Sequence, residues 1–281
     1  MALKNIIFQF ERDGDTILMD GSLFGVTEYS GIESSDYELT TETNTNADGE
    51  RLKKRHVLSR QIMVNFDYLF WGGISEMRQR LIGFFSPYQG GKLTVNYLDV
   101  TREIEYEVSS FKMNNTNVYD ELSCLLYLKC LDPSFKSAQV SVPIHTLVGG
   151  WKWKFSLPFR LKQYGELKQN IYNNGHIETP VEIYFKGPAT SPQITNHRTG
   201  ETIRVNRDLT ADETLYINTQ FLGKKVEVIK GAAREDAWNY LDKNISDFFW
   251  LQPGDNMIEY SSGSLKSIGV DIFYRERFLG V

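Results

Sequence analysis

Histidine, cysteine and carboxylate residues are the side chains of this sequence most able to bind metals or transfer protons. His176-Ile177-Glu178 has the spacing of a zinc site in which the histidine binds zinc and the glutamate transfers protons. That chemistry also needs a pair of cysteines further along the chain, and the sequence lacks this pair. The other histidines, His56, His145 and His197, are scattered through predicted turns and strand edges. We therefore expect no metal site and no cofactor.

The two cysteines, Cys124 and Cys130, lie in one predicted strand at 122–130. At ~3.3 Å per residue of extended chain they stand ~20 Å apart, too far for a disulfide within that strand. Two thiols without two further ligands also make no structural zinc site. We interpret both as small buried apolar side chains, and we expect synthesis in a reducing compartment.

Carboxylates are frequent, but their spacing does not show whether any two face each other across a cleft, as a glycosidase requires. Glu103, Glu105 and Glu107 alternate with other residues at a period of two, which is typical of a solvent-facing strand surface. The sequence has no glycine-rich phosphate loop and no Gly-x-Ser-x-Gly turn. We predict that the protein is not an enzyme, and a hydrolase that uses these carboxylates is an alternative.

Two clusters favour binding to a partner over catalysis. The first is a basic cluster that follows a predicted turn: Arg51, Lys53, Lys54 and Arg55. It could contact phosphate or an acidic partner, or it could simply solvate an extended arm. The second is the aromatic segment 151–155, in which Trp151 and Trp153 share one strand face. These rings fit a sugar or a neighbouring side chain, and they equally fit a buried row.

The overall composition argues against a dedicated nucleic-acid binder. The 281 residues fit two domains, with 41% hydrophobic and 24% charged residues, as in ordinary globular proteins. A formal net charge of −5 lacks the basic excess of tight phosphate binding, so we expect only passive contact with nucleic acid. The start of the sequence lacks a signal-peptide pattern, and no run approaches the ~20 apolar residues of a membrane span. We expect cytoplasmic synthesis and no membrane partner.

The first predicted domain, residues 1–135, consists mainly of strands, which suit the many aromatic residues. One helix is predicted at about 75–85, because Met77, Leu81 and Phe84 fall at helical spacing and Ser86-Pro87 ends the pattern. The apolar stripe of this helix should pack on a sheet. Its charged stripe, which includes Arg78 and Arg80, should face solvent or a partner.

A polar segment at about 34–60 interrupts the first domain. Asp48-Gly49 between two extended runs is a hairpin signal, and few large apolar residues lie between Thr40 and Arg55. We predict a hairpin arm that the chain's own core cannot bury and that is ready for a neighbour. The candidate interface residues on arm and helix are Thr43, Asn46, Arg51, Lys53, Lys54, Arg55, Arg78 and Arg80.

The second predicted domain, residues 136–281, has short strands at regular spacing with turns between them, which is typical of a β-sandwich. Its motifs follow one another in a characteristic order: Asn173-Asn174-Gly175-His176-Ile177-Glu178-Thr179-Pro180, Gly187-Pro188, Ser191-Pro192-Gln193-Ile194, Leu215-Tyr216-Ile217-Asn218, Phe249-Trp250-Leu251-Gln252-Pro253-Gly254-Asp255-Asn256 and Val270-Asp271-Ile272-Phe273-Tyr274-Arg275. This series resembles the C-terminal domain of the distal tail proteins of siphophages. In the first half, the arm, the helix and Leu131-Asp132-Pro133 agree with the layout of that family.

The resemblance implies a mainly β protein. Its N-terminal β-sandwich-like domain, related to tail-tube subunits, carries one packed helix and an extended hairpin arm. A galectin-like C-terminal β-sandwich follows, and its last strand can return towards the first domain.

The resemblance also implies a structural role in the virion, at the distal tail tip. Six copies form a ring that joins the tail tube to the baseplate hub and leaves a channel for DNA passage. The implied partners are further copies of the chain, the tail tube protein, the hub or tail-associated protein, and receptor-binding proteins.

Carbohydrate binding does not follow from a galectin-like shape, because shape and function are separable. A tail module that contacts the host cell wall through Trp151, Trp153 or Trp250 is therefore the alternative function.

Overall fold

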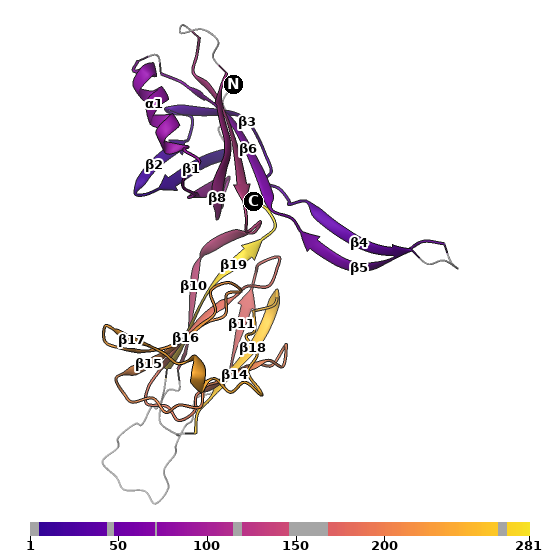
Figure 1. The fold of residues 1–281 in the computed structure, drawn as a ribbon, viewed down its shortest axis with the longest axis vertical. Helices are drawn as coiled ribbons and strands as arrows, with labels where there is room; N and C mark the ends of the chain where they lie inside the picture. The colour runs from indigo at the N-terminus through magenta and orange to yellow at the C-terminus, as the bar shows by residue number, and fades with distance from the viewer. Residues whose placement is uncertain (1–5, 44–47, 71, 115–119, 146–167, 264–268) are drawn as a thin grey trace, which may run out of the picture. The chain divides into compact units, whose positions relative to one another are not determined.

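The computed structural model describes residues 6–43, 48–70, 72–114, 120–145, 168–263 and 269–281. Within these residues the chain is built mainly of strands, as predicted, and it divides into two compact units (Figure 1). Unit 1 comprises residues 1–138 and 278–281, and unit 2 comprises residues 139–277. The chain leaves unit 1 within β10 (Phe135–His145) and returns to it within β19 (Gly269–Phe278).

Unit 1 contains two antiparallel sheets that share one long strand, β8 (Val100–Met113). One sheet has the order β2-β1-β7-β8 and the other β3-β6-β9-β8. The first half of β8 pairs with β7 and the second half with β9, with a register shift between Val108 and Ser110. Such a bulge bends a strand, which lets β8 pass from one sheet to the other. The remaining elements are β1 (Ile6–Arg12), β2 (Asp15–Met19), β3 (Phe24–Ser30), β4 (Tyr37–Thr43), β5 (Glu50–Val57), β6 (Arg60–Tyr68), α1 (Ile74–Phe84), β7 (Gly91–Tyr97) and β9 (Ser123–Cys130).

Alternation along the strands sends one face of each sheet into the core of unit 1. Phe8 and Phe10 on β1, and Val64 and Phe66 on β6, are fully shielded from solvent, whereas the residues between them are partly exposed. The rings of Phe10 and Phe85 meet edge to face, with 5.4 Å between their centroids. Because burial follows a period of two, a one-residue slip in register would expose the whole apolar set.

The packed helix predicted from the sequence is α1, the one α-helix in the described part of the chain. It buries Leu81 and Phe84 against the core. At its end, the guanidinium of Arg12 donates hydrogen bonds to the backbone carbonyls of Phe84 and Ser86, the second at 3.0 Å. The last carbonyls of a helix have no partner within the helix, so this arginine from β1 supplies one.

Unit 2 also contains two antiparallel sheets, with the orders β17-β16-β15-β12-β19 and β11-β18-β13-β14. Ile183 and Ile272 of the first sheet and Ile194 and Ile258 of the second are fully shielded from solvent in one core. The elements are β11 (Lys168–Asn173), β12 (Val181–Lys186), β13 (Gln193–Asn196), β14 (Thr202–Arg204), β15 (Glu213–Asn218), β16 (Lys225–Lys230), β17 (Ala233–Asp236), the 3₁₀ turn η1 (Trp238–Tyr240) and β18 (Gly254–Ser261).

The motif Gln252-Pro253-Gly254-Asp255-Asn256 forms a loop that is held by its own asparagine. The side-chain nitrogen of Asn256 donates to the carbonyls of Gln252 at 2.7 Å and Gly254 at 2.9 Å. Its side-chain oxygen accepts the backbone N–H of Gln252 at 2.9 Å. Asn256 is fully buried, and these bonds satisfy its polar atoms. The motif therefore specifies local backbone geometry.

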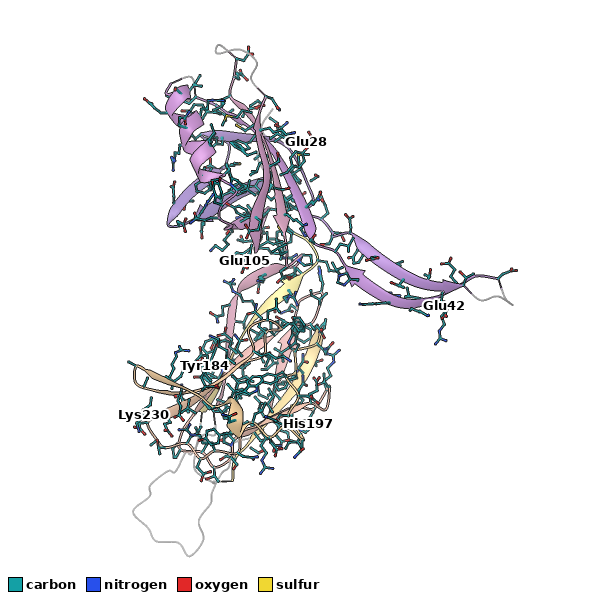
Figure 2. All side chains as sticks on the ribbon, viewed as in Figure 1. Glu28, Glu42, Glu105, Tyr184, His197 and Lys230 are labelled. Carbon is teal, nitrogen blue, oxygen red and sulfur yellow. The ribbon has the colours of Figure 1, made fainter. Side chains whose placement is uncertain are left out.

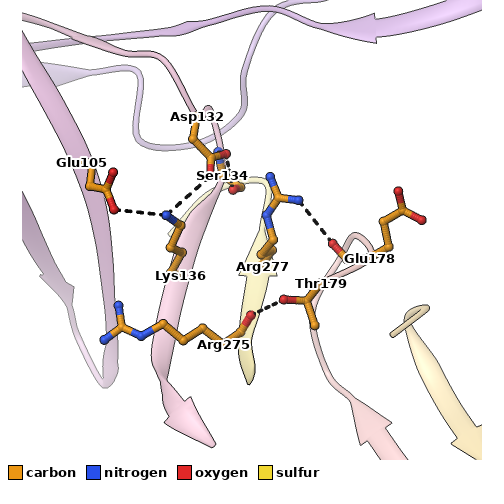
Figure 3. Close-up of polar contacts among 8 residues, drawn as sticks. All are labelled: Glu105, Asp132, Ser134, Lys136, Glu178, Thr179, Arg275 and Arg277. Carbon is orange, nitrogen blue, oxygen red and sulfur yellow. Dashed lines mark hydrogen bonds and ion pairs between the residues drawn. The ribbon is translucent and has the colours of Figure 1, made fainter. Parts of the chain in front are cut away.

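Polar contacts hold the first part of β10 in unit 1 and part of β19 in unit 2 (Figure 3). In unit 1, Lys136 of β10 bridges Glu105 at 3.3 Å and Asp132 at 3.5 Å. In unit 2, the hydroxyl of Thr179 donates to the backbone carbonyl of Arg275 on β19.

Cys124 and Cys130 both lie in β9 and are buried in the core of unit 1, as predicted from the sequence. They form no disulfide, and burial raises the pKa of each thiol to about 12. The thiolate is the reactive form of cysteine. Both residues are therefore inert in the folded protein.

We predict that an aromatic disulfide reagent labels neither cysteine of the native protein at about pH 8, because buried thiols stay protonated and inaccessible. Both should react once guanidinium unfolds the chain. The measurement is the absorbance of the released thiolate, with and without denaturant. Rapid labelling of a native thiol would contradict this account of β9.

Candidate functional site

The arm predicted from the sequence is the hairpin of β4 and β5, which form a two-stranded sheet of their own. Every residue of β4 is exposed, and in β5 only Val57 is half-buried. The hairpin extends beyond the two sheets of unit 1, and its side chains, including Glu42, reach into solvent (Figures 1 and 2). An isolated two-stranded hairpin is marginal in water. The arm therefore lacks the burial that stabilises the rest of unit 1.

The strand register gives the arm two different faces. Tyr37, Leu39 and Leu52 lie on one side, because Leu39 and Thr41 alternate in step and Thr41 pairs with Leu52. We call Tyr37, Leu39 and Leu52 the apolar face; their exposures are 50%, 59% and 40%. The opposite side holds charged and polar residues: Glu38, Thr40, Glu42, Arg51, Lys54 and His56. One side of the arm thus carries its large apolar side chains, together with Glu50 and Arg55, and the other side is polar throughout.

The predicted basic cluster lies along β5 and is exposed throughout. Lys53, at the register shift, pairs with Glu42 at 3.0 Å, and both side chains are about half exposed, so the pair contributes little stability. Arg55 lies on the same side as Leu39, its cross-strand partner. Thr43 is exposed at the end of β4, and Asn46 falls outside the described residues.

The two helix arginines named as interface candidates both have contacts within unit 1. Arg80 pairs with Asp15 of β2 at 2.9 Å. The guanidinium of Arg78 lies 2.9 Å from the sulfur of Met113. Both side chains are exposed, so they remain reachable for a partner. Their present contacts hold α1 against the sheets.

The root of the arm, residues 31–36 and 58–60, is organised by one buried arginine. Arg60, at the start of β6, is 2% exposed. Its Nε donates to the carbonyl of Pro133 at 2.9 Å, one Nη to the carbonyl of Gly31 at 2.7 Å, and the other Nη to the carbonyl of Leu279. Burial lowers the pKa of Arg60 from its usual value. The guanidinium thus joins three segments that are far apart in the sequence.

Gly31 can be only glycine at this root. Its φ of +86° is one that other residues rarely adopt, and a Cβ there would lie 1.9 Å from the backbone oxygen of Gln61. The chain therefore passes close against β6 just before it enters the arm. Arg60 and the apolar face are features that the sequence analysis missed. The burial of Arg60 could have been predicted from its position in the strand alternation. It lies two residues before Ile62 and four before Val64, so all three side chains point to the same face of β6.

The aromatic candidates separate in the structure. Trp151 and Trp153 fall outside the described residues. Trp250 is half-buried in unit 2, where its indole N–H donates to the carbonyl of Thr219 at 2.8 Å. The guanidinium of Arg277 lies 5.5 Å from the centre of its ring. Trp250 therefore supports the fold of unit 2.

Among the described residues, no three His, Cys, Asp or Glu side chains are grouped so as to hold a metal ion. No helix in the same residues is long and apolar enough to cross a membrane.

Among the sites in the described residues, we predict that trypsin cleaves the dissociated protein first in the arm, after Arg51, Lys53, Lys54 or Arg55, because these sites are exposed in a marginal hairpin. Mass spectrometry of the early fragments checks the sites. Arg60 is the matched control, since the same enzyme should not reach that buried residue. Early cleavage after Arg60 would show that the root is open.

Comparison with known proteins identifies this architecture. Residues 174–278 match the family described as siphovirus-type tail component, C-terminal domain. The fold of the chain matches that of the Dit protein (gp 19.1) of phage SPP1, with a TM-score of 0.69 and 16% identity over 98% of this chain and 99% of that one. It also matches a chain of the phage P2 baseplate in its activated conformation with Ca, with a TM-score of 0.57 and 10% identity over 96% and 98%. The baseplate with Sr gives 0.55 and 10% over 95% and 97%.

No curated protein sequence matches the chain. The motifs read from 173 onwards coincide with the family match, and the resemblance predicted from the sequence is confirmed. Residues 174–278 therefore match the C-terminal domain of the siphovirus-type tail component family, and the chain has the fold of a siphophage distal tail protein.

Proposed function

We propose that this protein is a structural subunit of a phage tail tip. Six copies associate through their arms into a ring that joins the tail tube to the baseplate hub. The ring leaves a channel for DNA. The fold shared with SPP1 Dit, a protein described as a paradigm of the hub adsorption apparatus in phages that infect Gram-positive bacteria, supports this role. The role is structural and needs no catalytic site.

The observation that carries this proposal is the apolar face of the arm. Three large side chains, Tyr37, Leu39 and Leu52, stand about half exposed on a hairpin whose strands pair with no other strand in the described part of the chain. Burying such a side chain contributes about 1.5–3 kcal/mol. A second copy is the natural source of that burial, because an arm on every copy can reach the next copy around a closed ring.

The charge of the protein supports passive DNA passage. The formal net charge is −5, so a ring of these subunits repels the phosphate backbone overall. A channel that attracted phosphates would slow the exit of DNA. The ring thus guides DNA without binding it tightly.

The partners of the ring follow from its place in the tail. The tail tube protein lies on one side, and the hub or tail-associated protein lies on the other. Receptor-binding proteins attach around the tip. The likeness to a chain of the phage P2 baseplate supports this setting. The protein is assembled in the host cytoplasm and remains in the virion.

We predict a solution mass of about 194 kDa, six times the 32.4 kDa of the chain, by light scattering after gel filtration. Negative-stain images of the same fraction should show an annulus. Adding purified tail tube protein and hub protein tests whether these neighbours are needed. A monomer of 32.4 kDa that persists with both neighbours present would overturn the ring.

We predict that Leu39→Asp weakens self-association by about 30-fold per contact, because losing one buried leucine costs about 2 kcal/mol. Thr40→Asp is the matched control, since Thr40 is the next residue of the same strand and lies on the opposite side of the arm. The dissociation constants come from sedimentation velocity over a dilution series. Equal effects of the two substitutions would show that the apolar face is not the contact.

A further inference from the structure

The last four residues of the sequence, Phe278–Val281, lie in unit 1, although the whole of unit 2 separates them from it along the chain. Phe278 is 8% exposed and is part of the unit 1 core. The guanidinium carbon of Arg102 lies 3.6 Å from the centre of its ring, which is a close cation–π contact. Phe278 therefore anchors this segment by its side chain.

The backbone of the segment is recognised residue by residue. The carbonyl of Leu279 accepts a hydrogen bond from Arg60, and the carbonyl of Gly280 accepts one from Arg102. The N–H of Val281 donates to the carbonyl of Ile32 at 2.9 Å. One anchored ring followed by backbone hydrogen bonds is the way in which proteins bind extended peptides.

Gly280 makes the fit specific. A Cβ on Gly280 would lie 1.5 Å from the backbone oxygen of Glu33, and 3.0 Å from that of Ile32. Backbone atoms cannot move aside as the end of a flexible side chain can. The segment thus lies directly on the chain that leads into the arm, and any residue larger than glycine at 280 displaces it.

The same contacts hold the arm root. Arg60 binds Leu279 with one donor and binds Gly31 and Pro133 with the others. Ile32, which accepts the bond from Val281, is the next residue after Gly31. If the segment leaves, Arg60 keeps one donor unpaired in a buried position, which is costly. The position of the root therefore depends on the segment.

We infer that unit 1 contains a peptide-binding site, formed by Ile32, Glu33, Arg60 and Arg102, whose ligand is the chain's own segment Phe278–Val281. Occupation of this site fixes the root of the arm. In the proposed function the arm mediates self-association, so self-association should need the bound segment. This consequence rests on the proposed function.

The test uses the full chain with Gly280→Ala, which should displace the segment. Gly223→Ala is the matched control, because a Cβ at Gly223 would have no atom closer than 3.8 Å. Hydrogen exchange followed by mass spectrometry reports on the root, where the N–H of Leu58 bonds the carbonyl of Asp36. We expect at least about tenfold faster exchange at Leu58 and Val281 in Gly280→Ala, as after the loss of a local contact, and no change in Gly223→Ala.

A second measurement asks whether the vacated site binds the segment in trans. The probe is a fluorescent peptide of residues 277–281, Arg-Phe-Leu-Gly-Val, and its control is the same peptide with Gly280→Ala. Fluorescence anisotropy should show binding of the first peptide to the Gly280→Ala chain. The wild-type chain, whose site is filled, should bind neither peptide. Equal binding to both chains, or no binding together with unchanged exchange, would overturn the site.

Circular dichroism checks whether the Gly280→Ala chain folds. Should it unfold, Arg102→Gln replaces it in the exchange measurement alone, because this change weakens the hold on the segment without a steric clash but also alters the site that the peptide would occupy. The solution mass separates the two proposals. A wild-type chain that stays monomeric with tail tube and hub proteins present, and that shows the expected exchange and peptide binding, keeps the site and overturns the ring. A wild-type ring with unchanged exchange in Gly280→Ala keeps the ring and overturns the site.

Discussion

The buried guanidinium of Arg60 is the interaction on which the organisation of unit 1 depends. A fixed fork of donors can bind several carbonyls at once, and here it binds one from each of three segments. A hydrocarbon side chain in its place would leave three carbonyls without this donor, at about 1–3 kcal/mol for each group that stays buried and unpaired. The arginine keeps its charge in the fold although burial lowers its pKa. The arm, the β9–β10 connection and the last residues of the chain thus have one common point of attachment.

The two units divide the tasks of the molecule. Each has its own core, and the sequence match to the siphovirus-type tail component family lies in the second, at residues 174–278. The first unit carries the arm, which has almost no burial of its own. A fold of this kind separates stability from association, since the sheets hold the unit together while the hairpin offers apolar surface. Charged side chains on the opposite side of the arm, such as Glu42 and Lys54, favour solvent and limit aggregation of free chains.

The sequence allowed the mainly β fold, the packed helix and the arm to be predicted, because these depend on local periodicity and turn signals. One strand was predicted at 122–130, and β9 runs from Ser123 to Cys130. The apolar face was missed because it depends on register: the shift between Thr40 and Thr41 decides which residues lie beside Leu52. Arg60 was missed because arginine is almost never buried without a specific partner. Its partners are carbonyls, which every residue possesses and no sequence pattern marks. The family resemblance implied that the last strand can return towards the first domain, but the contacts of Phe278–Val281 join residues far apart in the sequence, so spacing along the sequence does not identify them.

The return of Phe278–Val281 to unit 1 sets an order of events during synthesis. A ribosome makes the arm early, but it must then make the roughly 140 residues of unit 2 before the segment that completes the arm's attachment exists. Arg60 and Leu279 are 219 residues apart, so at about 5–20 residues per second the delay lasts about 11–44 s. Throughout that time Arg60 lacks the third of its backbone carbonyl partners. The attachment of the arm root is therefore completed only after both units have been synthesised.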